Sequence, residues 1–330
     1  MSAKIGRRTR RVLPAVVVLG LFAVLPVLLW WGNQTFYLGI VSRIMILGLA
    51  AVGLNLILGY GGLVSFGHAM YLGIGAYAVG ILSANGYDSA GAHVLWALGI
   101  GLFVSALVGW ICLKTEGMAF IMITLAFGQM FYFLSISLKQ YGGDDGLPVV
   151  SRSKLPLVDT ANPYSFYYLS FAILLLVLFI CYRLVNSRFG FVLQGCKQNE
   201  RRMKALGFDT YKFKLLAYVL SAEIAVIAGV LLANLAKFAS PSYLNWTLSG
   251  DLILMCVLGG ASSLIGPLIG AAAFVALEDF LSTMPVRLPG EWNDLVTTHW
   301  LGIFGVFVVL VVIFVRRGLY GVLQERANRA

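Results

Sequence analysis

Residues 37–58 of this chain read YLGIVSRIMILGLAAVGLNLIL, and Arg43 is the single charged side chain in the run. A helix needs about 20 predominantly apolar residues to cross the hydrocarbon core of a bilayer. A helix on the surface of a soluble protein would instead show one apolar and one polar face. The run therefore predicts a transmembrane helix.

Comparable runs recur along the 330 residues, of which 60% are hydrophobic and 12% are charged. Soluble domains carry about 25% charged residues, so the composition excludes a soluble enzyme, a disordered chain and a disulfide-stapled secreted domain. The four cysteines, Cys112, Cys181, Cys196 and Cys256, stand apart from one another and are expected to be free thiols without a metal. The sequence predicts an all-α fold, a polytopic bundle of transmembrane helices.

Ten spans are expected, at about 12–31, 37–58, 66–83, 93–112, 118–138, 164–184 and 214–235, two within 246–283, and 299–315. The stretch 246–283 is interrupted by Gly259-Gly260-Ala261-Ser262-Ser263. Two short spans, or a re-entrant hairpin near 259–266, would both return the chain to the side from which it came. Small residues at four-residue spacing, such as Ser221, Ala225 and Gly229, predict close helix packing within the bundle.

The positive charges indicate how the bundle is oriented. Five basic residues precede the first span, six lie between residues 185 and 213, and four lie after residue 315. The positive-inside rule places these segments in the cytoplasm, so the net charge of +10 does not indicate a nucleic-acid partner. The expected organisation is a cytoplasmic N-terminus (1–11), one permease domain (12–315) with a cytoplasmic loop (185–213), and a cytoplasmic tail (316–330). Residues 85–92, 139–163 and 284–298 are expected outside.

A glycine-rich break, Gly59-Tyr60-Gly61-Gly62, separates the second and third spans. Glycine disfavours a regular helix, and irregular backbone at membrane depth is tolerated where it is buried in protein or lines a water-filled cavity. The break is interpreted either as a tight turn on the inner side or as the lining of a translocation path. The polar and glycine residues that would line such a path are Asn55, Gly59, Gly62, Ser65, His68 and Tyr71.

The long basic loop contains a stretch, residues 197–206, that predicts a short helix ended by Gly207. It is interpreted either as a solvated or headgroup-facing loop or as a surface that docks on a cytoplasmic partner. The residues assigned to docking are Lys197, Glu200, Met203, Ala205, Leu206 and Gly207. The stretch Gly190–Lys197 resembles a phosphate-binding loop, but its lysine is one position late and Gln198 follows it. The chain is therefore not expected to be an enzyme, and any ATP would be hydrolysed by another chain.

Two ionisable residues, Arg43 and Glu223, fall well inside predicted spans, and Asp251, Glu278 and Asp279 fall nearer to span ends. Charges at membrane depth are costly unless they are paired or hydrated. Structural pairing, for example of Glu223 with Arg43, is one interpretation. A proton- or ion-coupling site is the other.

Several motifs in one order resemble branched-chain amino acid ABC transporter permeases of the LivM/LivH type, the LivM branch most of all. They include Gly67-His68 with Gly73-Ile-Gly75-Ala-Tyr77, Thr124-Leu-Ala-Phe-Gly128, Gly142-Gly-Asp-Asp-Gly-Leu147, Ser187-Arg-Phe-Gly190, Ala205-Leu-Gly207, Ser240-Pro241 and Gly266-Pro267. Gln129 departs from the pattern, since such permeases frequently have Glu at this position, and it too is expected to line the path.

The resemblance implies a multi-pass subunit in the bacterial cytoplasmic (inner) membrane, without a cofactor of its own. Its expected partners are a second homologous permease, two cytoplasmic ATPase subunits and an external substrate-binding protein. The segment from about Gly195 to Leu206 would be the coupling helix. The implied solute is a branched-chain or related amino acid, although the family also serves urea and short amides. An ion-coupled secondary transporter using Glu223, Asp251 or Glu278 is the alternative.

Overall fold

The computed structural model describes residues 16–29, 35–155, 159–261, 263–283, 300–314 and 318–321. A first helix, Val16–Leu29, precedes the labelled elements. These are α2 (Thr35–Asn55), the π-helical turn η1 (Leu56–Tyr60), α3 (His68–Ala84), α4 (Ala90–Cys112), α5 (Met118–Ser137), the 3-10 turn η2 (Lys139–Tyr141), β1 (Leu147–Pro148), α6 (Pro163–Val185), α7 (Arg188–Ala205), α8 (Thr210–Ala236), β2 (Phe238–Ala239), the 3-10 turn η3 (Pro241–Leu244), α9 (Trp246–Gly259), α10 (Gly266–Thr283) and α12 (Trp300–Phe314).

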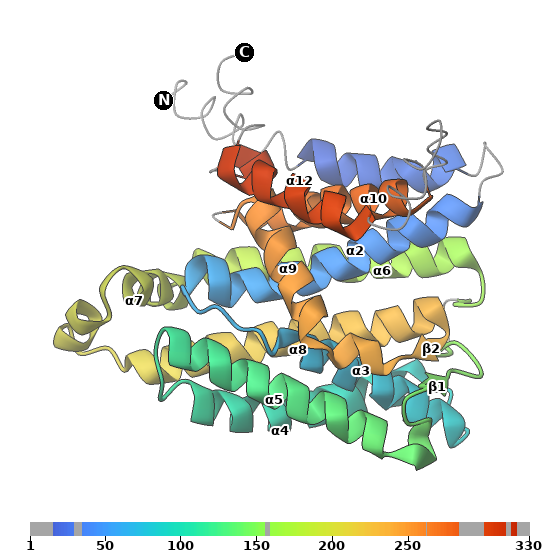
Figure 1. Cartoon of the computed structure of the whole chain (residues 1–330), viewed down its shortest axis with the longest axis horizontal. Coiled ribbons are helices and arrows are strands. Elements are labelled where there is room, and N and C mark those ends of the chain that lie inside the picture. Colours follow the sequence, from blue (N-terminus) through green and yellow to red (C-terminus); the bar gives the residue numbers. More distant parts are fainter. Residues whose placement is uncertain are drawn as a thin grey trace.

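The all-α prediction is confirmed for the described residues. Most long helices run in one general direction, α9 crosses them, and α7 and the β1–β2 pair lie at opposite ends of the bundle (Figure 1). Five helical stretches in the described part are long and apolar enough to cross a membrane, namely Phe36–Tyr60, α4, α5, α6 and α8. Val16–Leu29, α3 and α9 are apolar but shorter. The chain is thus a multi-pass membrane protein, and the count of ten spans stays a prediction.

Helix α8 forms the centre of the bundle and packs against α2, α3 and α4. Its approach to α3 is close because glycines face backbone at both crossing points. A Cβ on Gly229 would overlap the carbonyl oxygen of Leu72, and a Cβ on Gly75 would overlap that of Val226. The predicted stripe of small residues on α8 is therefore used for packing within the chain, as expected where no hydrophobic force drives helices together.

The predicted break after the second span is present, but it begins later than the glycines suggest. Gly59 and Tyr60 still belong to the π-helical turn η1, and the irregular segment is residues 61–67. This segment leads from the α7 end of the bundle back into its interior, where α3 begins (Figure 1). The first turn of α3 is accordingly enclosed on all sides, and His68, Ala69 and Met70 are fully buried.

The end of the bundle opposite α7 is built from segments that the sequence places together on the outer side. Strand β1 pairs antiparallel with β2, and Ser89 forms a parallel bridge with Lys154. The Asn234 side chain accepts a hydrogen bond from the backbone N–H of Ser153 at 2.7 Å. Residues 85–92, 139–155 and 236–245 thus lie together at one end of the bundle, and the side of the membrane that this end faces stays a prediction. Residues 1–11 and 284–298 and most of the tail lie outside the described residues.

Candidate translocation and coupling site

The two glycine-rich breaks of the sequence meet in space at the α7 end of the bundle. The Asn55 side chain, fully buried, donates a hydrogen bond to the carbonyl oxygen of Ser263 at 2.9 Å. Gly59 packs so closely against Ala261 that a Cβ at this position would overlap the Ala261 carbonyl oxygen. Two segments about 200 residues apart therefore form one structure, which we call the break junction (residues 55–62, 259–261 and 263–266).

Helix α7 is attached directly to the break junction through Lys197. The ammonium group of Lys197 donates to the carbonyl oxygen of Gly59 at 2.6 Å. Gly62 has φ of +71°, and a Cβ on it would lie 2.9 Å from Cγ of Lys197. Glycine adopts this left-handed backbone far more readily than other residues, so the conformation at position 62 favours glycine. Any displacement of α7 would act on the break through this contact.

Helix α7 is longer than the sequence predicts. We expected a loop from residue 185 with a short helix at 197–206, whereas the helix begins at Arg188 and is kinked at Asn199, where φ and ψ are −160° and 99°. The Asn199 side chain accepts from the backbone N–H of Arg202 at 3.0 Å and so begins the second part of the helix as an N-cap. The end at Gly207, with φ of +87°, is as predicted.

Glu200 holds the second part of α7 against the start of α8. Its carboxylate pairs with Lys214, with Lys204 at 3.0 Å, and accepts from the hydroxyl of Thr210 at 2.9 Å. Partial burial alone would raise the pKa of Glu200, but the hydrogen bonds from Lys214, Lys204 and Thr210 outweigh it and lower the pKa to about 2. Glu200 therefore stays ionised at every physiological pH, and this attachment of α7 does not respond to protons.

The exposed apolar surface of α7 differs in part from the predicted one. Leu206 is 65% exposed, as a docking residue would be, and Ala205 is exposed too. Met203 instead packs on its own helix, since its sulfur would lie 2.6 Å from a Cβ on Gly195. The sequence reasoning overlooked Phe191, which is 71% exposed, because it fell in the part of α7 expected to be a loop.

The residues expected to line a path are mostly enclosed within this chain. Asn55, Ser65, His68 and Tyr71 are fully buried. His68 Nε2 lies 2.9 Å from the Ser221 hydroxyl, and the Tyr71 hydroxyl donates to that of Tyr218 at 3.0 Å. These groups connect α3 to α8 at the level where the irregular segment ends. Their contact with a solute stays a prediction, as does that of Gln129, whose amide nitrogen is buried without a hydrogen-bond partner among the described residues.

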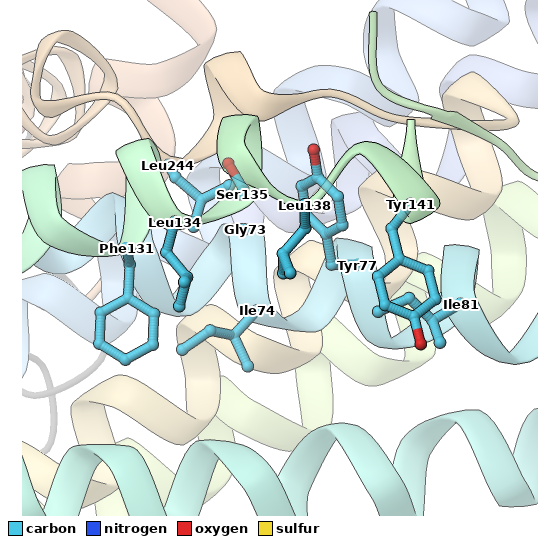
Figure 2. Close-up of a pocket in the computed structure, with 10 residues that line it drawn as sticks. All are labelled: Gly73, Ile74, Tyr77, Ile81, Phe131, Leu134, Ser135, Leu138, Tyr141 and Leu244. Atoms are coloured by element: carbon cyan, nitrogen blue, oxygen red, sulfur yellow. The ribbon is translucent and has the colours of Figure 1, made fainter. Parts of the chain in front are cut away.

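A cavity that the sequence reasoning did not find lies between α3, α5 and η3 (Figure 2). It measures about 120 Å³ and is mostly apolar. The hydroxyl groups of Tyr77 and Ser135 lie on one side of it, and the Tyr141 hydroxyl points the other way (Figure 2). Gly73, Tyr77 and Ile81 recur at four-residue spacing along α3, which is the sequence signal that marks this face.

The charged residues at membrane depth do not pair as suggested. Arg43 forms an ion pair with Glu278 of α10, with 3.5 Å between Nη2 and Oε2. Pairing of Arg43 with Glu223 is therefore wrong. Glu223 faces α4, where a Cβ on Gly101 would lie 3.1 Å from its Oε1, and this oxygen has no hydrogen-bond partner in the described part of the chain.

Replacement of Glu223 with glutamine tests whether this carboxylate carries protons. An unpaired carboxylate at membrane depth is costly in its charged form, and glutamine keeps its shape without the charge. We expect Glu223→Gln to leave solute uptake at roughly the wild-type rate and the melting temperature of the purified complex no lower. Abolished uptake in a stable, fully assembled complex would support ion coupling through this residue instead.

The fold and this site define a class of protein. It is a multi-pass helical membrane protein in which two glycine-rich breaks meet at one end of the bundle and a surface helix is attached to them. The sequence matches the family described as "Branched-chain amino acid transport system / permease component" over residues 36–315. The chain belongs to this family.

The sequence identity to individual members of this family is low. The chain is 26% identical over 269 residues to the high-affinity branched-chain amino acid transport system permease protein LivM of Salmonella typhimurium, covering 73% of this chain and 63% of LivM. It is 28% identical over 298 residues to the autoinducer 2 import system permease protein LsrC of Yersinia pseudotuberculosis, covering 86% of this chain and 80% of LsrC. No solved structure shows significant similarity.

Proposed function

We propose that this chain is the permease subunit of an ATP-driven importer in the bacterial cytoplasmic membrane. It would pair with a second, related permease, and two cytoplasmic ATPase subunits would supply the energy. An external binding protein would deliver a branched-chain or related amino acid. The contact of Lys197 with Gly59 at 2.6 Å carries the proposal, because it connects a polar surface helix to the broken helix inside the bundle.

The alternative of an ion-coupled transporter is supported less well. Such a protein needs no docking surface for an ATPase, yet Phe191 in α7 and Leu206 at its end present large apolar side chains on a surface whose other exposed residues are polar, apart from Ala205. Glu278, one of the candidate coupling groups, is paired with Arg43. Family membership also favours the importer, because the family is described as the permease component of a transport system.

Reconstitution tests the proposal. The permease pair, the ATPases and the binding protein would be assembled in proteoliposomes, with ATP inside and labelled leucine outside. We expect uptake to require both ATP and the binding protein and to survive collapse of the ion gradients. Uptake by the permease alone, driven by a proton or sodium gradient, would overturn the proposal. Competition by urea, acetamide and autoinducer 2 would identify the class of solute.

The proposed orientation is testable separately. The four native cysteines are free and buried, so we expect them to react slowly with a thiol reagent. Labelling of a single introduced cysteine can then be measured above that background. We expect a membrane-impermeant thiol reagent added outside to label Asp145→Cys and not Arg201→Cys, both of which are exposed positions. Labelling at 201 in sealed cells would invert the topology. The matching outer position proposed at Asn293 lies outside the described residues.

A further inference from the structure

A cavity of about 320 Å³ opens between α4 and α6 at the end of the bundle opposite α7. Val94 of α4 lines one wall, Phe166 and Ile173 of α6 line the other, and Leu231 and Asn234 of α8 line the inner side. The residues of the connecting segment that cover its end are Ser153, Leu155 and Thr160. The lining is almost entirely apolar, and the volume lies within the range of about 300–1,000 Å³ that is usual for small-molecule sites.

The two helices that form the walls leave most of their surface uncovered. Helix α4 packs mainly on α8, and α6 packs mainly on α2. In the most apolar part of each helix, 33% of α4 and 28% of α6 are buried, compared with 72% of α8. At the opening between them Gly91 is exposed and Val94 is 37% exposed. Exposed apolar surface on a membrane-spanning helix meets the hydrocarbon core of the bilayer, so the cavity opens toward acyl chains.

The depth of the cavity corresponds to one leaflet. Its lining on α6 extends to Ile173, ten residues after the start of the helix at Pro163. At a rise of 1.5 Å per residue this distance is about 15 Å. The hydrocarbon core of a bilayer is about 30 Å thick. A space that is apolar over half of this thickness fits an extended hydrocarbon chain better than a compact polar solute.

Arg152 provides a fixed cation at the covered end of the cavity. Its Nε donates to the carbonyl oxygen of Asn234 at 3.1 Å, and its Nη1 donates to that of Thr160 at 2.9 Å. Its guanidinium carbon lies 5.1 Å from the centre of the Phe166 ring. All three of these partners line the cavity. The guanidinium is therefore held at the edge of the apolar space.

This cation has binding capacity that the chain does not use. Among the described residues, Arg152 forms no ion pair, and its Nη2 makes no hydrogen bond. The carboxylates nearest to it in the sequence have other partners: Asp159 accepts from the backbone N–H of Ala161 at 3.0 Å, and Asp88 pairs with Lys154 at 3.1 Å. A guanidinium presents its N–H donors in a planar fork that matches a phosphate group.

We infer that this cavity binds a phospholipid of the surrounding bilayer, with one acyl chain between α4 and α6 and the phosphate at Arg152. The apolar depth and the cation at its end match the two parts of such a molecule, and they lie in the order that a lipid requires. In the proposed orientation the lipid belongs to the outer leaflet. The inference goes beyond the proposed import function and rests on it only for the choice of leaflet.

Photo-crosslinking in the assembled importer tests the site. The probe is phosphatidylglycerol with a diazirine on one acyl chain, added at a low mole fraction to the importer in lipid nanodiscs. We expect mass spectrometry of the peptides to find cross-links concentrated on residues 166–173 of α6. Excess unlabelled phosphatidylglycerol should reduce them, and glycerophosphoglycerol, which has the phosphate without acyl chains, should not.

Two neighbouring residues of α4 give a matched pair of variants. Val94 lines the cavity, whereas Leu95 is 74% exposed and does not line it. Val94→Trp fills the opening and displaces several methylene groups of the chain, so cross-linking at 166–173 should fall about tenfold or more. Leu95→Trp adds the same side chain to the outer surface and should leave the cross-links unchanged.

Substitution of Arg152 tests the phosphate contact. Arg152→Met should raise the mole fraction of probe needed for half-maximal cross-linking about tenfold, since it removes hydrogen bonds to a charged group. Arg152→Lys should restore part of the affinity because it keeps the charge. Lys139→Gln removes another exposed cation at the same end of the bundle and should have no effect. Val94→Trp keeps the contacts of Arg152 with the backbone and serves as the test if Arg152→Met fails to assemble.

Several results would contradict the inference. Cross-links spread equally over the outer surface of α4 and the cavity would indicate annular lipid only. The absence of cross-links in the cavity would mean that the second permease or another segment covers it. Equal cross-linking in Val94→Trp and Leu95→Trp, or unchanged affinity in Arg152→Met, would also overturn the assignment. ATP-dependent uptake in the same preparation reports on the importer function separately, so loss of the lipid site leaves that proposal standing.

Discussion

Replacement of Gly62 with leucine should reduce ATP-driven uptake about tenfold or more while the protein still inserts and assembles. The backbone at this position has φ of +71°, which costs a residue other than glycine roughly 1–2 kcal/mol. Its Cβ would also lie 2.9 Å from Cγ of Lys197, so the larger side chain must shift the Lys197 side chain that attaches α7 to the break. A loss of about 1.4 kcal/mol in the coupled state corresponds to a tenfold change in its population. Uptake rates at equal complex concentration measure the effect.

Gly86 supplies a matched control for the strain of the backbone. It has φ of +81° but nothing within 4 Å of a Cβ, and it lies at the opposite end of the bundle. Gly86→Leu should lower the melting temperature to a similar extent and keep most of the uptake. Equal uptake by Gly62→Leu and Gly86→Leu would mean that the contact between α7 and the break does not transmit motion.

The long helices could be predicted from the sequence because each is a continuous apolar run ended by polar residues or glycine. The expected spans at 118–138 and 164–184 correspond closely to α5 at Met118–Ser137 and α6 at Pro163–Val185. The glycine-rich break between the second and third spans was also predictable, since glycine disfavours a regular helix. In both cases the deciding physics is local to a few residues.

Contacts between distant segments could not be predicted in the same way. Nothing in either glycine-rich break indicates that Asn55 binds the carbonyl oxygen of Ser263, and hydropathy alone does not choose between Glu223 and Glu278 as the partner of Arg43. The start of α7 at Arg188 was missed because basic composition was interpreted as a loop, whereas long basic side chains are good helix formers. Met203 was assigned to docking because it falls on the same side of the predicted helix as Leu206, whereas it packs against Gly195 and is only partly exposed.

Replacement of Leu206 with aspartate should release the ATPase subunits from the permease pair on purification, and uptake should fall with them. Leu206 is 65% exposed beside the C-terminal glycine of α7, so an aspartate there disturbs little within this chain. In a docked complex the leucine would be buried, and burying a leucine contributes about 1.5–3 kcal/mol. Aspartate would lose this free energy of burial and would place a charge in an apolar groove. Co-purified ATPase per permease pair is the measurement.

Val150 provides the control for a charge introduced on an exposed apolar residue. It is 80% exposed at the end opposite α7, and Val150→Asp should keep both the ATPases and the uptake. The neighbouring attachment of α7 gives a second comparison, because Glu200→Gln removes the carboxylate that holds α7 to Lys214 without touching the apolar surface. If Leu206 docks the ATPase while Glu200 positions the helix, Leu206→Asp should abolish binding and Glu200→Gln should weaken it. Wild-type ATPase content and uptake in Leu206→Asp would mean that the energy of ATP enters this permease through another surface.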